Sequence, residues 1–346
     1  MARQAFKIGG ETVSPGTRRT VDIHISQLSI HVPVQLSVHV IHGKRPGKTM
    51  FVSAAIHGDE IIGVEIIRRL LKLPVINRVH GTLILVPIVN AYGFLAHSRY
   101  LPDRRDLNRS FPGNHKGSLA AQLADAFMRE VVIPADLGVD LHSAAVHREN
   151  LPQMRISPGS KKLFDLARAF APPVILPANI RSGSLRDAAR AVQTEIMLYE
   201  AGEALRFDEA SIRIGVSGLL RVMHAIGMLS ASSVKGSKIV SAESESSSWA
   251  RAPEGGILRA LKKCGDNVEK GDVIGIIANP FGERETQVLA RYSGLIIGRT
   301  RLPVVNRGDG LFHIAKFAKA GSIAKSLEQV DAEWEANPHF DDDEIY

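Results

Sequence analysis

The sequence predicts an α/β domain followed by a smaller all-β module, from a β-α-β pattern in its first part and closely spaced turns in its last part. Residues 49–56 form an apolar strand-like run, residues 61–71 have the apolar spacing of a helix packed on a sheet, and residues 82–89 form a buried-strand candidate. Beyond residue 250, turn residues recur at short intervals between β-rich runs. The β-α-β order implies a functional site at the carboxyl ends of the strands.

Further short strands and helices continue the α/β pattern. Half-buried strands are predicted where apolar and polar residues alternate, and a helix where alanines recur. The expected half-buried strands are 21–25 and 36–41, further short strands are expected at 138–142 and 195–199, and the expected helix is 118–130. His24 and His39 fall on strand faces, where we expect ordinary strand residues rather than ligands.

Composition divides the chain into three parts. Residues 230–248 are poor in bulky apolar side chains, which indicates a boundary. We therefore expect an α/β domain with amino-terminal strands over residues 1–235 and a barrel-like accessory β-domain over residues 245–320. Residues 321–346 are acidic and lack apolar periodicity, so they are predicted to form an acidic tail.

Bulk properties exclude several classes of function. The 346 residues are 45% hydrophobic, enough for a sizeable core. The net charge of +7 is scattered and aromatic residues make up 5%, so we expect attraction to small anionic substrates rather than nucleic acid. No apolar run is long enough to span a membrane and no secretory core is visible, so we expect a cytoplasmic protein without membrane partners. Cys264 is the single cysteine, which rules out an internal disulfide, and a homo-oligomer is compatible with the sequence.

His57-Gly58-Asp59-Glu60 is the most informative stretch. Directly after an apolar strand, it offers an imidazole and a carboxylate, both good ligands for Zn²⁺. The plain alternative is a strand-to-helix turn in which Asp59 or Glu60 lies near a helix amino terminus.

A third ligand is available at the end of another predicted strand. His142, in Asp140-Leu-His-Ser143, follows His57 by 85 residues, and two close ligands with one distant would leave a zinc position open for water. Between them, Asn108 and Arg109 could bind a substrate carboxylate, although the same stretch is also compatible with a polar loop.

Four motifs taken in order resemble the succinylglutamate desuccinylase/aspartoacylase family, a branch of the zinc carboxypeptidase-like hydrolases. They are His57-x-x-Glu60, the stretch 106–113, Asp140-Leu-His-Ser143 and Glu200-Ala-Gly202, and segments 252–258 and 302–313 resemble that family's carboxyl-terminal β-domain. The resemblance covers roughly residues 50–320. It implies a mixed central sheet flanked by helices, with a smaller domain that resembles a biotinyl/lipoyl-type barrel.

The resemblance also implies roles for individual residues. His57, Glu60 and His142 would hold one zinc ion, and Glu200 would act as general base and acid. Asn108 and Arg109 would hold the substrate's carboxylate.

Some assignments stay open between neighbouring residues. The oxyanion formed during amide hydrolysis needs a second positive partner, for which Arg99 is the candidate and Arg104 and Arg105 are competitors. Asp140 lies on the same strand face as His142, where it supports this ligand or makes an ordinary structural hydrogen bond. Glu203 is a weaker alternative base.

Substrate-binding candidates come from two further segments. Asn150, Gln153 and Arg155 follow the third ligand and could line the pocket, and a strand after a turn explains them nearly as well. Tyr292 of the β-module could reach the site or be a buried strand residue. Arg155 and Tyr292 are therefore predicted to bind substrate beside Asn108 and Arg109.

The leading function is a zinc-dependent deacylase that cleaves the amide bond of a small N-acyl amino acid. The alternative within this chemistry is a zinc carboxypeptidase acting on peptides. Residues 266–275 also resemble carrier domains, but the corresponding hairpin tip, 278–283, has no lysine for biotin or lipoate. Metal binding without catalysis is disfavoured, because Glu200 and Arg109 would then lack a purpose.

Overall fold

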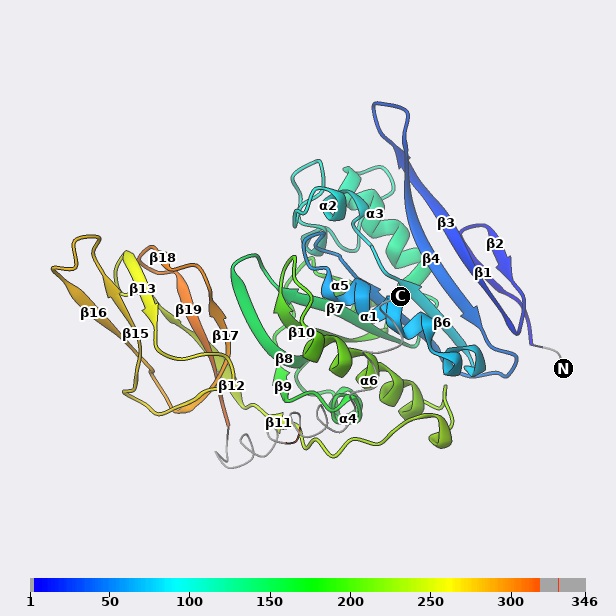
Figure 1. The fold of residues 1–346 in the computed structure, drawn as a ribbon. Helices are drawn as coiled ribbons and strands as arrows, with labels where there is room; N and C mark the ends of the chain where they lie inside the picture. Colours follow the sequence, from blue (N-terminus) through cyan, green and yellow to red (C-terminus); the bar gives the residue numbers. More distant parts are fainter. Residues whose placement is uncertain (1–2, 318–328, 330–346) are drawn as a thin grey trace, which may run out of the picture.

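The structure, a computed structural model, describes residues 3–317 and residue 329 of the chain. A large mixed sheet is covered by helices and continues into a carboxyl-terminal β-module, which lies at one end of the molecule in Figure 1. The predicted fold class is confirmed. The acidic tail expected over 321–346 lies outside the described residues, apart from Gln329.

Within the described residues, thirteen strands form the large sheet, and ten of them follow the order β12-β19-β17-β8-β10-β7-β5-β6-β4-β3. Their bounds, with those of β9, β11 and β14, are β3 Thr17–Gln27, β4 Pro33–His42, β5 Thr49–Ala54, β6 Thr82–Val86, β7 Leu137–Ala144, β8 Arg148–Ile156, β9 Val174–Pro177, β10 Glu195–Glu203, β11 Ala242–Glu243, β12 Ser246–Arg251, β14 Asn267–Val268, β17 Gly294–Thr300 and β19 Gly310–Lys316. A separate amino-terminal ribbon pairs β1 (Phe6–Ile8) with β2 (Glu11–Val13).

The centre of the large sheet is parallel. Strands β10, β7, β5 and β6 run in the same direction, whereas β4 and β8 pair antiparallel at the two flanks. Strand β7 is buried along its whole length, as a strand with neighbours on both sides and helices on both faces must be. The carboxyl ends of β5, β7 and β10 therefore meet at one edge of the sheet.

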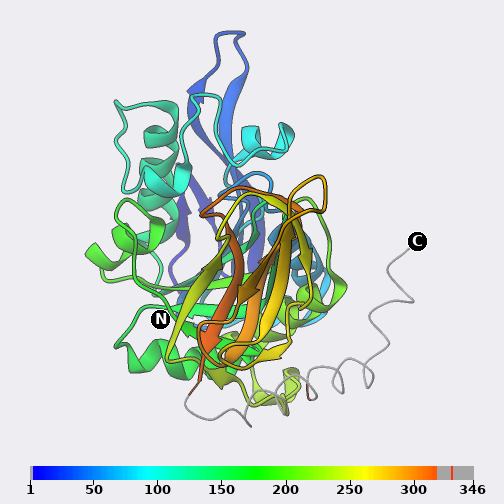
Figure 2. The same cartoon turned by 90° about the vertical axis from the view of Figure 1, so that its left-hand side faces the viewer.

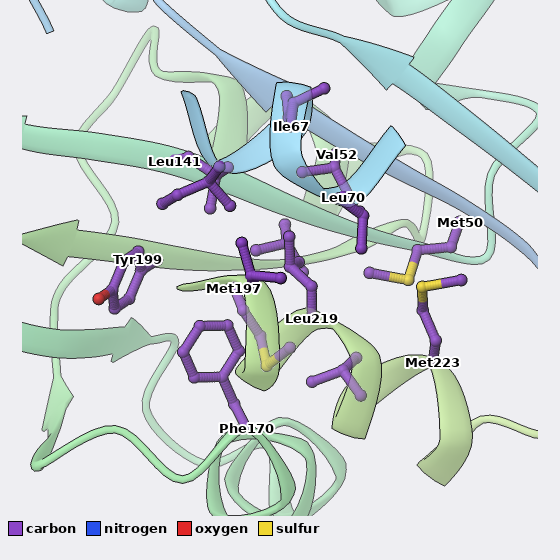
Figure 3. Packing of buried hydrophobic residues seen from close by; sticks show 14 of the residues in the cluster. Met50, Val52, Ile67, Leu70, Leu141, Phe170, Met197, Tyr199, Leu219 and Met223 are labelled. Atoms are coloured by element: carbon purple, nitrogen blue, oxygen red, sulfur yellow. The ribbon is translucent and has the colours of Figure 1, made fainter. Parts of the chain in front are cut away.

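Helices pack on both faces of this sheet. Helices α1, α4 and α6 contribute to one apolar cluster, part of which Figure 3 shows, with Phe170 and Leu219 against Met197 and Tyr199 of β10. Helices α3 and α5 contribute to the cluster on the other face. The helix bounds are α1 Ile62–Lys72, α2 Ala91–Leu95, α3 Leu119–Phe127, α4 Lys161–Phe170, α5 Leu185–Ala191 and α6 Glu209–Ala225, with shorter turns η1 Pro74–Arg78, η2 Leu107–Arg109, η3 Met128–Val132 and η4 Ala231–Ser233.

The carboxyl-terminal module, residues 246–316, is made of two sheet segments that share one core. Strands β12, β14, β17 and β19 belong to the large sheet, and they face a four-stranded antiparallel sheet of order β16-β15-β13-β18. The module lies nearest the viewer in Figure 2. The bounds of the second sheet are β13 Gly256–Ala260, β15 Val273–Ala278, β16 Glu285–Leu289 and β18 Val304–Val305. Because β17 pairs antiparallel with β8, the module continues the sheet that carries the parallel strands.

The described part of the chain contains no helix that is both long and apolar enough to cross a membrane.

Candidate active site

The turn after β5 is shaped by a close approach of two backbone segments. A Cβ atom on Gly58 would lie 1.9 Å from the carbonyl carbon of Gly93 in α2, so only glycine fits there. This packing holds the turn against the sheet and buries both flanking ligand candidates, His57 at 4% and Glu60 at 3% exposure. Asp59, between them, is also buried but lies outside the ligand cluster.

Glu60 joins the two histidines through its two carboxylate oxygens. Oε1 lies 2.6 Å from Nδ1 of His57, and Oε2 lies 2.6 Å from Nδ1 of His142 at the end of β7. The three candidate ligand atoms lie within 4.8 Å of one another. Two imidazole nitrogens and a carboxylate oxygen form a donor set that suits Zn²⁺ and leaves a coordination position for water or substrate.

A carboxylate lies behind each imidazole. Nε2 of His142 is 2.7 Å from Oδ2 of Asp140, whose Oδ1 accepts a hydrogen bond from Ser53 at 2.7 Å. Nε2 of His57 lies 3.3 Å from Oδ1 of Asp106. Carboxylates in these positions favour protons on Nε2 and leave Nδ1 free to bind a metal, so the residues present fit a metal ion. The role of Asp106 was missed in the sequence, although it begins the Asp-Leu-Asn-Arg motif.

Charges within the cluster hold Glu60 ionised. Burial alone would raise the pKa of Glu60, but the neighbouring His57 and His142 lower it far below its usual range. Burial alone would lower the pKa of His142, but Asp140 and Glu60 raise it well above the ordinary histidine value. The carboxylates of the cluster therefore favour a nearby positive charge, which a divalent cation would supply.

Arg99 lies beside this cluster. Its Nη2 donates to Oδ2 of Asp106 at 2.9 Å, and its Nη1 lies 3.2 Å from Nδ1 of His57 and 3.4 Å from Oε1 of Glu60. The competing arginines are elsewhere: Arg104 and Arg105 are both exposed and neither lines the cavity described next.

A cavity of about 840 Å³ opens over the cluster and contains most of the remaining candidates. Glu200 of β10 projects into it, with Oε2 accepting from Asn150 at 2.7 Å and Oε1 paired with Nη1 of Arg155 at 3.1 Å. Asn108 and Arg109 also line it. Oδ1 of Asn108 accepts from the backbone N–H of Leu185 at 2.9 Å, which leaves the amide NH₂ group as the donor that this side chain can offer a ligand.

The module contributes different residues to the cavity from the one expected. Tyr292 is not among its lining residues: its hydroxyl is 2.6 Å from the Ser248 hydroxyl and donates to the Ile314 carbonyl at 3.0 Å. Trp249 and His313 line the wall instead. Their rings stack with centroids 4.9 Å apart, a pairing that the sequence alone did not reveal.

Three arginines add positive charge to the cavity without having been singled out in the sequence. Arg148 lies over the Trp249 ring at 5.1 Å, and Arg181 and Arg186 also line the cavity. Burial, together with the charge of Arg155, lowers the pKa of Arg186. A cavity with this balance of charges favours an anionic substrate.

The fold and site define a class of α/β protein with a candidate catalytic metal centre at the carboxyl ends of parallel strands. Comparison with known proteins makes this more specific. Residues 46–226 match the model of the succinylglutamate desuccinylase/aspartoacylase catalytic domain. The chain belongs to the succinylglutamate desuccinylase/aspartoacylase family, as its motifs indicated.

Individual relatives agree with this assignment. The chain is 27% identical to the N-alpha-acetyl-L-2,4-diaminobutyric acid deacetylase of Halomonas elongata over 79% of this chain and 84% of that protein. A crystal structure of a succinylglutamate desuccinylase from Silicibacter sp. TM1040 is 26% identical, with a TM-score of 0.78 over 87% of this chain and 94% of the other. The product-bound ectoine utilization protein of Ruegeria pomeroyi, 24% identical, shares the fold with a TM-score of 0.78 over 91% and 96% of the two chains.

Proposed function

We propose that this protein is a zinc-dependent deacylase that cleaves the amide bond of a small N-acyl amino acid. The observation that carries the proposal is the position of Glu200 in the same cavity as the His57–Glu60–His142 cluster. The Halomonas relative, by its name, removes an acetyl group from an N-acetylated amino acid, which supports this reaction type. A cytoplasmic location remains part of the proposal.

Each residue has a task in this reaction. His57, Glu60 and His142 would hold the zinc ion, which would lower the pKa of a water molecule and polarise the amide carbonyl. Glu200 takes the proton of the attacking water and passes it to the leaving amine. Arg99 supplies positive charge to the oxyanion that forms on the carbonyl oxygen.

The substrate carboxylate has a separate place. Arg109 and Asn108 line the cavity, and the guanidinium and the amide NH₂ group offer donors that match a carboxylate. The module forms part of the cavity wall through Trp249 and His313, which restricts the space available for a long peptide. This wall favours an N-acyl amino acid over the peptide substrate of a carboxypeptidase.

The test is hydrolysis of a panel of N-acyl amino acids and short peptides by wild type and Glu200→Gln, with zinc content measured for both. We expect retained zinc and a fall in kcat of about 10²- to 10⁴-fold. The matched control is Glu203→Gln on the same strand, whose carboxylate lies near Arg301 and outside the cavity lining and should not be needed. Full turnover by Glu200→Gln would remove Glu200 from the mechanism, and activity on peptides alone would replace the deacylase with the carboxypeptidase.

A further inference from the structure

Asn150 of β8 lies between two glycines of the neighbouring strands. It is opposite Gly202 of β10 on one side and opposite Gly298 of β17 on the other. Directly opposite residues in antiparallel strands project on the same face, so a glycine on each side leaves the row free for the Asn150 side chain. That side chain is 7% exposed and donates from Nδ2 to Oε2 of Glu200.

The space at Gly298 is needed by the Asn150 amide. A Cβ atom at position 298 would lie 2.7 Å from Oδ1 of Asn150 and 3.2 Å from the carbonyl oxygen of Glu149. The first distance is shorter than a carbon and an oxygen tolerate, so the amide would have to turn or move. Nδ2 belongs to the same rigid amide, so that movement would lengthen or misalign its hydrogen bond to Glu200.

Strand β8 is the common support of both partners of Glu200. Arg155, which pairs with Oε1 of Glu200, lies on β8 with Asn150. The strand is fixed to the module by its pairing with β17 and by Gln153, whose Nε2 donates to the Ile297 carbonyl at 3.3 Å. The module therefore supports β8, the strand whose side chains hold the Glu200 carboxylate.

We propose that Gly298 is a positioning residue for catalysis: by leaving room for the Asn150 amide, β17 of the module keeps the Glu200 carboxylate in its working orientation. This inference rests on the proposed function, in which Glu200 is the general base. It assigns the module a part in the chemical step, in addition to its part in the cavity wall.

The experiment compares Gly298→Ala, Asn150→Ala and the double variant in the full-length, zinc-loaded protein. Each single change should lower kcat by at least about tenfold with KM little changed, because the base is misplaced while the substrate carboxylate is still bound. The double variant should be no worse than Asn150→Ala, because both changes remove one and the same contact. Zinc content and the thermal unfolding midpoint are measured for every variant.

The matched control is Gly275→Ala in β15 of the same module. Its Cβ would lie 3.0 Å from a side-chain carbon of Leu258, a tight but less severe contact within the module that does not involve Asn150. This variant should keep the wild-type kcat even if its unfolding midpoint falls.

Three results would overturn the inference. The first is that Gly298→Ala has the same kcat as Gly275→Ala. The second is that the losses in kcat of the two single variants multiply in the double variant. The third is that Asn150→Ala keeps the wild-type kcat. The third result can be measured even if Gly298→Ala does not fold. Full turnover by Glu200→Gln would instead refute the proposed mechanism, in which Glu200 is the general base. A strongly impaired Glu200→Gln beside a fully active Gly298→Ala refutes only the role of Gly298.

Discussion

Replacing Asp140 by asparagine tests whether the carboxylate behind His142 strengthens the metal site. The substitution keeps the shape of the side chain, and its amide can still accept from Nε2 of His142 and donate to the Ser53 hydroxyl. It removes the negative charge, and because Asp140 is only 1% exposed, solvent cannot compensate for the loss of that charge. We therefore expect weaker zinc binding without unfolding.

The magnitude follows from the kind of hydrogen bond that is lost. A hydrogen bond to a charged group contributes about 1.5–3 kcal/mol and a neutral one about 0.5–1.5 kcal/mol. The difference of about 1–2 kcal/mol corresponds to about 5- to 30-fold in affinity. This range overlaps the loss of about 10- to 100-fold that follows removal of carboxylates behind metal-ligating histidines.

The assay is a competition titration of zinc against a chromogenic chelator at one fixed pH. Asp136→Asn is the matched control, because Asp136 precedes the same strand but pairs with Lys48 at the surface. A zinc affinity of Asp140→Asn equal to that of wild type would refute the reasoning, and so would an equal loss in Asp136→Asn.

Three further predictions concern other parts of the site. Arg99→Met should lower kcat by about 10²-fold with zinc retained, because the oxyanion loses a donor. Steady-state kinetics with metal analysis checks this, and an unchanged kcat would mean that another group stabilises the oxyanion. Gly58→Ala should lower the free energy of unfolding by about 1–3 kcal/mol, since its Cβ would overlap the backbone of Gly93. Urea denaturation measures the change, and a wild-type midpoint would contradict this close packing. Burial, and then the charge of Arg155, lowers the pKa of His313 to about 3 in the folded protein. In the unfolded chain this imidazole is protonated below about pH 6.5, whereas in the folded protein it stays neutral until about pH 3. Stability should therefore fall as pH drops from about 6.5 toward 3, and His313→Asn should flatten that part of a pH series of thermal unfolding midpoints.

Much of the α/β part could be predicted because its signals are local. The apolar run of β5, the helical spacing of α1 and the second apolar run of β6 fall where the sequence indicated them. The strand order brings His142 beside the His57 turn, and the rule that sites lie at the carboxyl ends of parallel strands anticipated this meeting.

Contacts that depend on packing between distant segments could not be predicted. Asp106 reaches His57 only because the loop before η2 folds over the β5 turn, and no periodic pattern encodes that approach. Trp249 faces His313 because of the register between β12 and β19, and a shift of one residue would turn the opposite face to the cavity. No local pattern tells whether a tyrosine of the module, such as Tyr292, reaches the site, and here its hydroxyl is engaged within the module.

The continuous sheet has a consequence for how this chain can be divided or recombined. If residues 236–346 were deleted, Arg148, Glu149 and Asn150 would lose their β17 partners and become a free strand edge, which invites pairing with other chains. A shortened protein is therefore expected to aggregate rather than to behave as an independent unit. In a chimera, a transplanted module would have to supply both a strand in register with β8 and a residue without a side chain opposite Asn150.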